Sequence, residues 1–78
     1  MARYYFRIIN DIEVDDAEGH EFDILANARQ YAVACARDLA AHDVRHGAVN
    51  LNHRIVVEGD AHEKILMVTF RDAFSITY

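Results

Sequence analysis

One segment, residues 23–47, has the pattern of a long amphipathic helix and restricts the possible folds more than any other feature of the sequence. Small and apolar residues recur there every three or four positions and so share one stripe: Leu25, Ala28, Ala32, Cys35 and Leu39, flanked by Ile24 and Tyr31. Asp23 is a suitable N-cap, and Gly47 is suited to end the helix. The pattern predicts a helix over about residues 24–46 whose small inner stripe packs closely against a sheet.

The opposite side of this helix is less polar than full exposure to solvent would require. Its residues are Ala26, Val33, Ala40 and Val44, interrupted mainly by Gln30 and Arg37. We therefore expect the back of the helix to be available to a partner.

Four further segments alternate apolar and polar residues, as strands with one buried face do. They are residues 3–9, 12–15, 53–58 and 64–70. Turn residues at 10–11 and 59–60 would join them into two hairpins, one on each side of the helix. The predicted fold is a single α+β domain over residues 1–78, ββαββ, with the helix on one face of an antiparallel four-stranded sheet.

Two shorter segments complete the pattern. Residues 16–22 are expected to connect the first hairpin to the helix, with Gly19 in a turn conformation that a residue with a Cβ would resist. Residues 74–78 alternate again and leave two interpretations open, a short fifth strand or an arm.

One helix covers only one face of a sheet, so the other face of a monomer would be polar. The alternation instead places an apolar group on that face: Tyr5, Ile9, Val56, Ile65 and Met67. A contiguous exposed apolar patch usually marks an interaction surface, and dimers are the commonest oligomers. We therefore expect a homo-oligomer, with a dimer favoured. The competing interpretations are a shifted strand register or a tail, residues 74–78, that folds over this face.

Composition and charge exclude several classes of protein. A net charge of −5 argues against general nucleic-acid binding, which requires a basic surface. No apolar run reaches the about 20 residues of a membrane span, and residues 1–9 lack the pattern of a secretion signal, so a cytoplasmic location is expected. The single cysteine, Cys35, excludes an intramolecular disulfide, and its place on the inner stripe predicts a buried, inert thiol.

Two patterns point to an alternative function, the binding of a metal ion or another small ligand. His42 and His46 are four residues apart on one helical face, a spacing at which two imidazoles can share a metal. Residues 11–23 hold seven carboxylates in thirteen positions and could gather a hard cation such as calcium, although their spacing differs from that of the known calcium loop. The histidine pair has no identifiable third ligand, so no cofactor is expected.

No pattern of a catalytic site is present in the sequence. The three glycines are too far apart for a phosphate-binding loop. Ser75 is the only serine, and nothing places it beside a base and an orienting acid. We therefore expect a protein that is not an enzyme.

Six segments carry a resemblance to a known family: Arg3-Tyr4-Tyr5-Phe6, Asp16-Ala17-Glu18-Gly19-His20-Glu21-Phe22, Ala28-Arg29, Ala36-Arg37-Asp38-Leu39, Arg54-Ile55-Val56-Val57 and Val68-Thr69-Phe70-Arg71-Asp72-Ala73. They resemble short, uncharacterised bacterial proteins, abundant in rhizobial-type genomes and classed as a domain of unknown function. The resemblance implies a bacterial cytoplasmic setting and supplies no activity, cofactor or catalytic residue. Val56 stands where family members often have an acidic residue, and Thr69 where they often have a proline, so the outer face here is more apolar or more strand-like. The segments before the helix also resemble, over a short stretch, small antitoxins that pair with a toxin.

Overall fold

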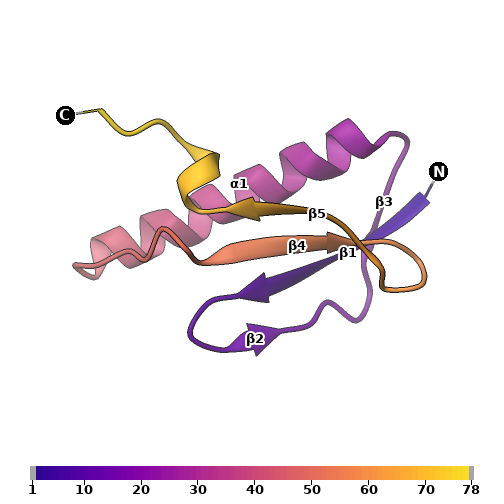
Figure 1. Ribbon diagram of the computed structural model, residues 1–78, viewed down its shortest axis with the longest axis horizontal. Helices are drawn as coiled ribbons and strands as arrows, with labels where there is room; N and C mark the ends of the chain where they lie inside the picture. Colours follow the sequence, from indigo (N-terminus) through magenta and orange to yellow (C-terminus); the bar gives the residue numbers. More distant parts are fainter. Residues whose placement is uncertain (1, 78) are drawn as a thin grey trace.

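The computed structural model describes residues 2–77, which form an antiparallel sheet of five strands and one long helix. In chain order the elements are β1 (Ala2–Ile9), β2 (Glu13–Val14), β3 (His20–Phe22), α1 (Leu25–Arg45), β4 (Arg54–Glu58), β5 (Lys64–Thr69) and a 3₁₀ turn, η1 (Arg71–Ala73). The strand order is β2-β1-β4-β5, and β3 pairs with the beginning of β1. In Figure 1 the sheet lies in front of α1, which covers only its far face. The predicted α+β fold, one helix on an antiparallel sheet, is confirmed.

The two predicted hairpins, β1–β2 and β4–β5, are both present. β1 and β4 pair side by side in the middle of the sheet, from Tyr5 opposite Glu58 to Ile9 opposite Arg54. The prediction that residues 16–22 are only a connection was wrong in its second half, because the chain pairs again with β1 as β3. The sheet therefore has one strand more than expected.

The Asp16 side chain stabilises the irregular segment between β2 and β3. One oxygen of its carboxylate accepts hydrogen bonds from the backbone N–H groups of Glu18 (3.3 Å) and Gly19 (3.0 Å), and the other accepts from the N–H of Phe6 in β1 (3.2 Å). Gly19 has a φ of 71°, which confirms the expected turn conformation. The side chain thus satisfies backbone donors that the interrupted strand leaves free.

The helix begins later than predicted. Ile24 is the N-cap residue and makes no side-chain cap bond, while its carbonyl accepts a hydrogen bond from the N–H of Asn27 (3.1 Å). The prediction that Asp23 is the N-cap was wrong, because β3 extends to Phe22 and the chain needs both following residues to turn into the helix. Asp23 therefore lies one residue before the cap.

The helix ends as predicted at Gly47. Its φ is 101°, and its N–H donates to the carbonyl of Val44 (2.9 Å). The N–H of Ala48 donates to the carbonyl of Asp43 (3.2 Å). These two bonds form the Schellman motif, in which a left-handed glycine satisfies the last carbonyls of a helix.

The core lies between α1 and the inner face of the sheet. Its buried apolar residues are Phe6, Ala28, Ala32, Val33, Ala36, Ala40, Ile55, Val57, Val68, Phe70 and Ala73. The alanines let the helix approach the sheet closely, and the larger side chains come from the strands.

The buried side of α1 is rotated relative to the prediction. Leu25 and Ile24, expected on the inner stripe, are 41 % and 57 % exposed, whereas Val33 and Ala40, expected on the back, are buried. The reason is η1, which packs against the helix beside β5 and accepts a hydrogen bond from the Arg37 guanidinium at the carbonyl of Ala73. The helix is covered on two sides, so its buried arc shifts toward η1.

Residues 74–77 form no strand, so the fifth-strand interpretation was wrong for this part of the tail, and residue 78 lies outside the described residues. η1 turns the chain away from the sheet, and Phe74 lies against the C-terminal half of α1. Figure 1 shows this segment beyond the end of β5 rather than across the front of the sheet. The tail therefore leaves the outer face uncovered as far as residue 77.

Candidate interaction surface

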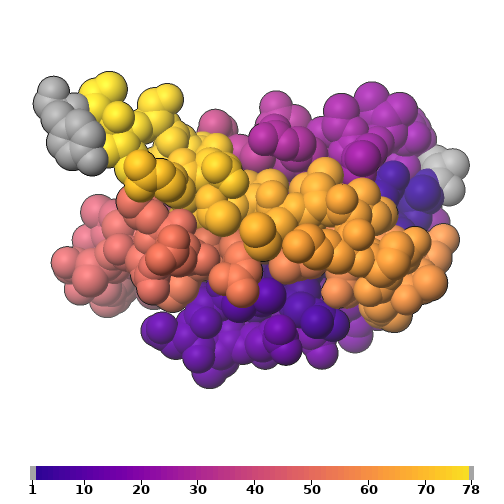
Figure 2. Space-filling view, viewed as in Figure 1, coloured from indigo at the N-terminus to yellow at the C-terminus, as the bar shows by residue number. Residues whose placement is uncertain are grey.

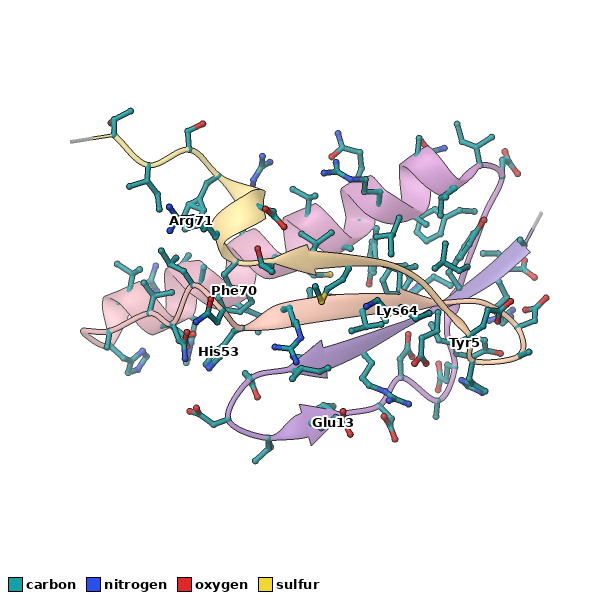
Figure 3. All side chains as sticks on the ribbon, in the orientation of Figure 1. Tyr5, Glu13, His53, Lys64, Phe70 and Arg71 are labelled. Atoms are coloured by element: carbon teal, nitrogen blue, oxygen red, sulfur yellow. The ribbon has the colours of Figure 1, made fainter. Side chains whose placement is uncertain are left out.

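The outer face of the sheet consists of three rows that cross the strands, because residues opposite each other in paired strands point to the same side. These rows are Tyr5–Glu58–Lys64, Arg7–Val56–Met67 and Ile9–Arg54–Thr69. The rows between them, Phe6–Val57–Leu66 and Ile8–Ile55–Val68, face the helix. Figure 3 labels Tyr5 and Lys64, which lie toward the same end of the sheet. The predicted division of the strands into an inner and an outer face is thus present, except that Ile65 lies at an irregularity of β5 between Lys64 and Leu66.

The five predicted surface residues are unequally exposed. Ile65 and Met67, both on β5, are 39 % and 41 % exposed, but Val56 on the central strand is only 7 % exposed. Tyr5 and Ile9 are partly buried, and the ring of Tyr5 lies 4.8 Å from that of His62. In Figure 2 the orange atoms of residues 60–70, which include β5, lie at the surface of this face. The exposed apolar area is therefore concentrated on β5, at the edge of the sheet.

Charged side chains that the sequence reasoning missed occupy the centre of the outer face. The Arg7 guanidinium lies 2.9 Å from the carboxylate of Asp15, 3.5 Å from that of Glu58 and 3.9 Å from that of Glu13. The Glu58 side chain is only 8 % exposed, and its second oxygen lies 3.5 Å from Nδ1 of His62. Strand alternation alone places Arg7 and Glu58 on this face, but only the register brings their charges together.

The two histidines named as candidates for the alternative, metal-binding function do lie together, at the exposed end of α1. Their ring centroids are 4.4 Å apart, and Nδ1 of His46 donates a hydrogen bond to the carbonyl of His42 (2.8 Å). Nδ1 of His42 lies 3.7 Å from the carboxylate of Asp43. Within residues 2–77, no three His, Cys, Asp or Glu side chains gather as a metal site would require. Imidazoles at this position also complement the negative end of the helix dipole.

The carboxylates of residues 11–23 are spread over separate partners. Asp11 lies 3.5 Å from Nε2 of His53, Glu21 lies 3.4 Å from the Arg3 guanidinium, and Asp16 binds backbone N–H groups. The carboxylates of residues 11–23 therefore do not converge on a single site for a cation.

A hollow of about 260 Å³ lies between α1 and the N-terminal strands. It is lined by three ionisable side chains that the sequence did not indicate as neighbours, His20, Tyr31 and Cys35. The hydroxyl of Tyr31 lies 3.1 Å from Nε2 of His20, and Cys35 follows Tyr31 by one helical turn. Cys35 is partly exposed rather than buried as expected. Burial raises the pKa of the Cys35 thiol, and burial together with the nearby thiol raises the pKa of Tyr31. A thiol with a raised pKa stays protonated at neutral pH and is a weak nucleophile.

The raised pKa of Cys35 predicts how stability depends on alkaline pH. The folded pKa lies above the ordinary value of 9.0, so as the pH rises past that value the unfolded chain loses its proton first. The free energy of unfolding should therefore fall above about pH 9, and Cys35→Ser should remove part of this fall. Urea unfolding at a series of pH values, compared for the two proteins, measures it. An alkaline loss that is identical in both proteins would contradict the assignment.

Comparisons with known proteins identify a family but no function. Among residues 2–77, no helix combines the length and the apolar character needed to cross a membrane. Neither the curated proteins nor the solved structures yielded a match to the chain. One family model, described as a domain of unknown function, matches residues 3–71, from β1 to the first residue of η1. Because this match covers most of the chain, the protein belongs to the DUF6894 family.

Proposed function

We propose that the protein is a non-enzymatic interaction module that forms a homodimer through β5 and the adjoining outer face of the sheet. The main observation in favour of this proposal is that Ile65 and Met67 are 39 % and 41 % exposed on a strand at the edge of the sheet. Burial of apolar surface contributes about 25 cal/mol per Å², so covering this strand is favourable. Tyr5, Ile9 and Val56 adjoin it on the same face and would form the less exposed part of the contact.

The total surface of the chain supports a contact of this kind. The accessible area is 5347 Å², whereas a monomer of 8.9 kDa is expected to expose about 4,800 Å². Figure 1 shows residues 74–77 extending from the body of the protein. A standard interface removes about 800 Å² from each partner, and small domains often gain stability by association.

The proposal includes a bacterial, cytoplasmic setting and the absence of catalysis. The setting rests on the resemblance to bacterial proteins and on a single cysteine in place of a disulfide framework. The Cys35 thiol is a weak nucleophile, because burial raises its pKa and disfavours the thiolate. The metal-binding alternative has less support than the dimer, because His42 and His46 have no third ligand among the described residues.

Sedimentation equilibrium over a wide range of protein concentrations tests the dimer. The unmodified chain should approach twice its 8.9 kDa mass, and Met67→Lys should weaken association by about tenfold or more, because it sets like charges in the contact. Ile12→Lys is the matched control, since Ile12 is 70 % exposed in the turn between β1 and β2, away from β5. A chain that stays monomeric at near-millimolar concentration would rule out the proposal.

A further inference from the structure

We infer that two copies of the chain join edge to edge through β5, antiparallel, with Met67 opposite Met67 of the second copy. This inference rests on the proposed self-association and narrows the contact to β5, so that Tyr5 and Ile9 on β1 and Val56 on β4 lie outside the pairing itself. In this arrangement the two sheets become one continuous sheet, and the exposed side chains of β5 come together at its centre.

The pairing of β5 with β4 determines which backbone groups of β5 remain free. The N–H of Phe70 donates to the carbonyl of His53 (2.8 Å), so this N–H points toward β4. Residues two apart along a strand direct their backbone groups to the same edge, so Leu66 and Val68 also face β4. Met67 lies between them and therefore directs its N–H and C=O away from the sheet.

Thr69 and Asp72 close one end of this free edge. The Asp72 carboxylate accepts a hydrogen bond from the N–H of Thr69 (3.3 Å), and the Thr69 hydroxyl accepts one from the N–H of Asp72 (3.1 Å). The reciprocal bonds resemble a capping box and occupy the edge beside Thr69. Met67 is left as the central open position, and an open strand edge readily pairs with another strand.

The opposite edge of the sheet is poorly suited to the same contact. It consists of β2, with two residues, and β3, with three, separated by the irregular segment that the Asp16 side chain stabilises. Glu13 and Asp15 share the single cation of Arg7 with Glu58, so this edge keeps a negative excess that two copies would have to bring together. β5 carries only one charged residue, Lys64, and lies at the other edge.

The proposed register is complementary to itself. With Met67 on the twofold axis, its N–H and C=O bond those of Met67 of the second copy, and Leu66 lies opposite Val68. Ile65 then lies opposite Thr69, whose N–H stays bonded to the Asp72 carboxylate, so the two Met67 residues make the central backbone hydrogen bonds of the contact. In this register Lys64 of each copy lies near Asp72 of the other copy. The dimer would therefore contain two symmetrical Lys64–Asp72 ion pairs. The β5 edge of each copy is covered by the other in this pairing, so association stops at the dimer.

α1 packs on both β4 and β5, and η1 packs against the same helix beside β5. Joining two β5 strands would therefore bring α1 and η1 of one copy next to those of the other, on the inner face of the joined sheet.

Disulfide cross-linking tests the register directly. Cys35→Ser combined with Met67→Cys leaves one cysteine at the predicted axis, where opposed Cα atoms would be about 5.5 Å apart, within the range that a disulfide spans. Mild oxidation should convert most of the protein to a covalent dimer. Cys35→Ser combined with Ile65→Cys is the matched control, because Ile65 is equally exposed on the same strand but lies well over 10 Å from its copy in this register.

Sedimentation of the reduced variants separates the two proposals. A dimer that cross-links at position 67 and not at position 65 supports the inference. A dimer that cross-links at position 65, or at neither position, overturns the β5 register while leaving the proposed self-association in place. A chain that is monomeric in every form overturns both, and circular dichroism of each variant verifies that it is folded.

Discussion

Replacement of Phe70 by alanine should lower the free energy of unfolding by about 4 kcal/mol. The Phe70 side chain is 0 % exposed at the end of β5, and its ring lies 5.6 Å from that of His53, edge to face. Figure 3 labels both residues at this end of the sheet. Removing the ring leaves a cavity that a close-packed core cannot refill. Small domains have about 5–10 kcal/mol of stability in total, so this variant should be close to unfolding at room temperature.

Phe74→Ala provides the control for this experiment. Phe74 has the same side chain four residues later but is 37 % exposed beside α1, so its loss should cost less than about 1 kcal/mol. Urea unfolding followed by circular dichroism compares the two variants with the unmodified chain. Similar losses in both would show that the core does not close over Phe70 as described.

Replacement of Gly19 by alanine should cost about 3 kcal/mol, through two separate effects. The φ of 71° is unfavourable for any residue with a Cβ, and the added Cβ would lie only 2.7 Å from the carbonyl oxygen of Tyr4. Because that oxygen belongs to the backbone of β1, relief requires β3 to move away from the sheet. Amide exchange at residues 20–22 should therefore accelerate more than exchange in β4.

Gly47→Ala separates conformational strain from the steric clash. Gly47 also has a positive φ, 101°, but no atom lies within 4 Å of the Cβ position, so only the conformational cost of about 1 kcal/mol is expected. Thermal or urea unfolding gives the comparison. If Gly19→Ala costs no more than Gly47→Ala, the close approach of Gly19 to β1 does not contribute to stability.

Much of the candidate surface could be predicted because strand alternation depends only on neighbouring residues. Alternation correctly separates the outer Tyr5, Ile9 and Val56 from the inner Phe6 and Ile8. It could not predict exposure, since Val56 is covered by strands on both sides whereas Met67 lies on an edge. Strand order depends on contacts between segments far apart in the chain, and for this reason the importance of the β5 edge emerges only from the structure.

The sequence by itself determined the helix, its end at Gly47, the two hairpins and the division of each main strand into two faces, because these features follow from periodicity and local backbone preference. Only the tertiary structure decided the rotation of α1, the start of the helix at Ile24 and the extra strand β3. η1 covers the Val33 side of the helix, and the Asp16 carboxylate binds Phe6 from ten residues away. Such contacts join segments with no common local pattern, so they form only when the whole chain packs.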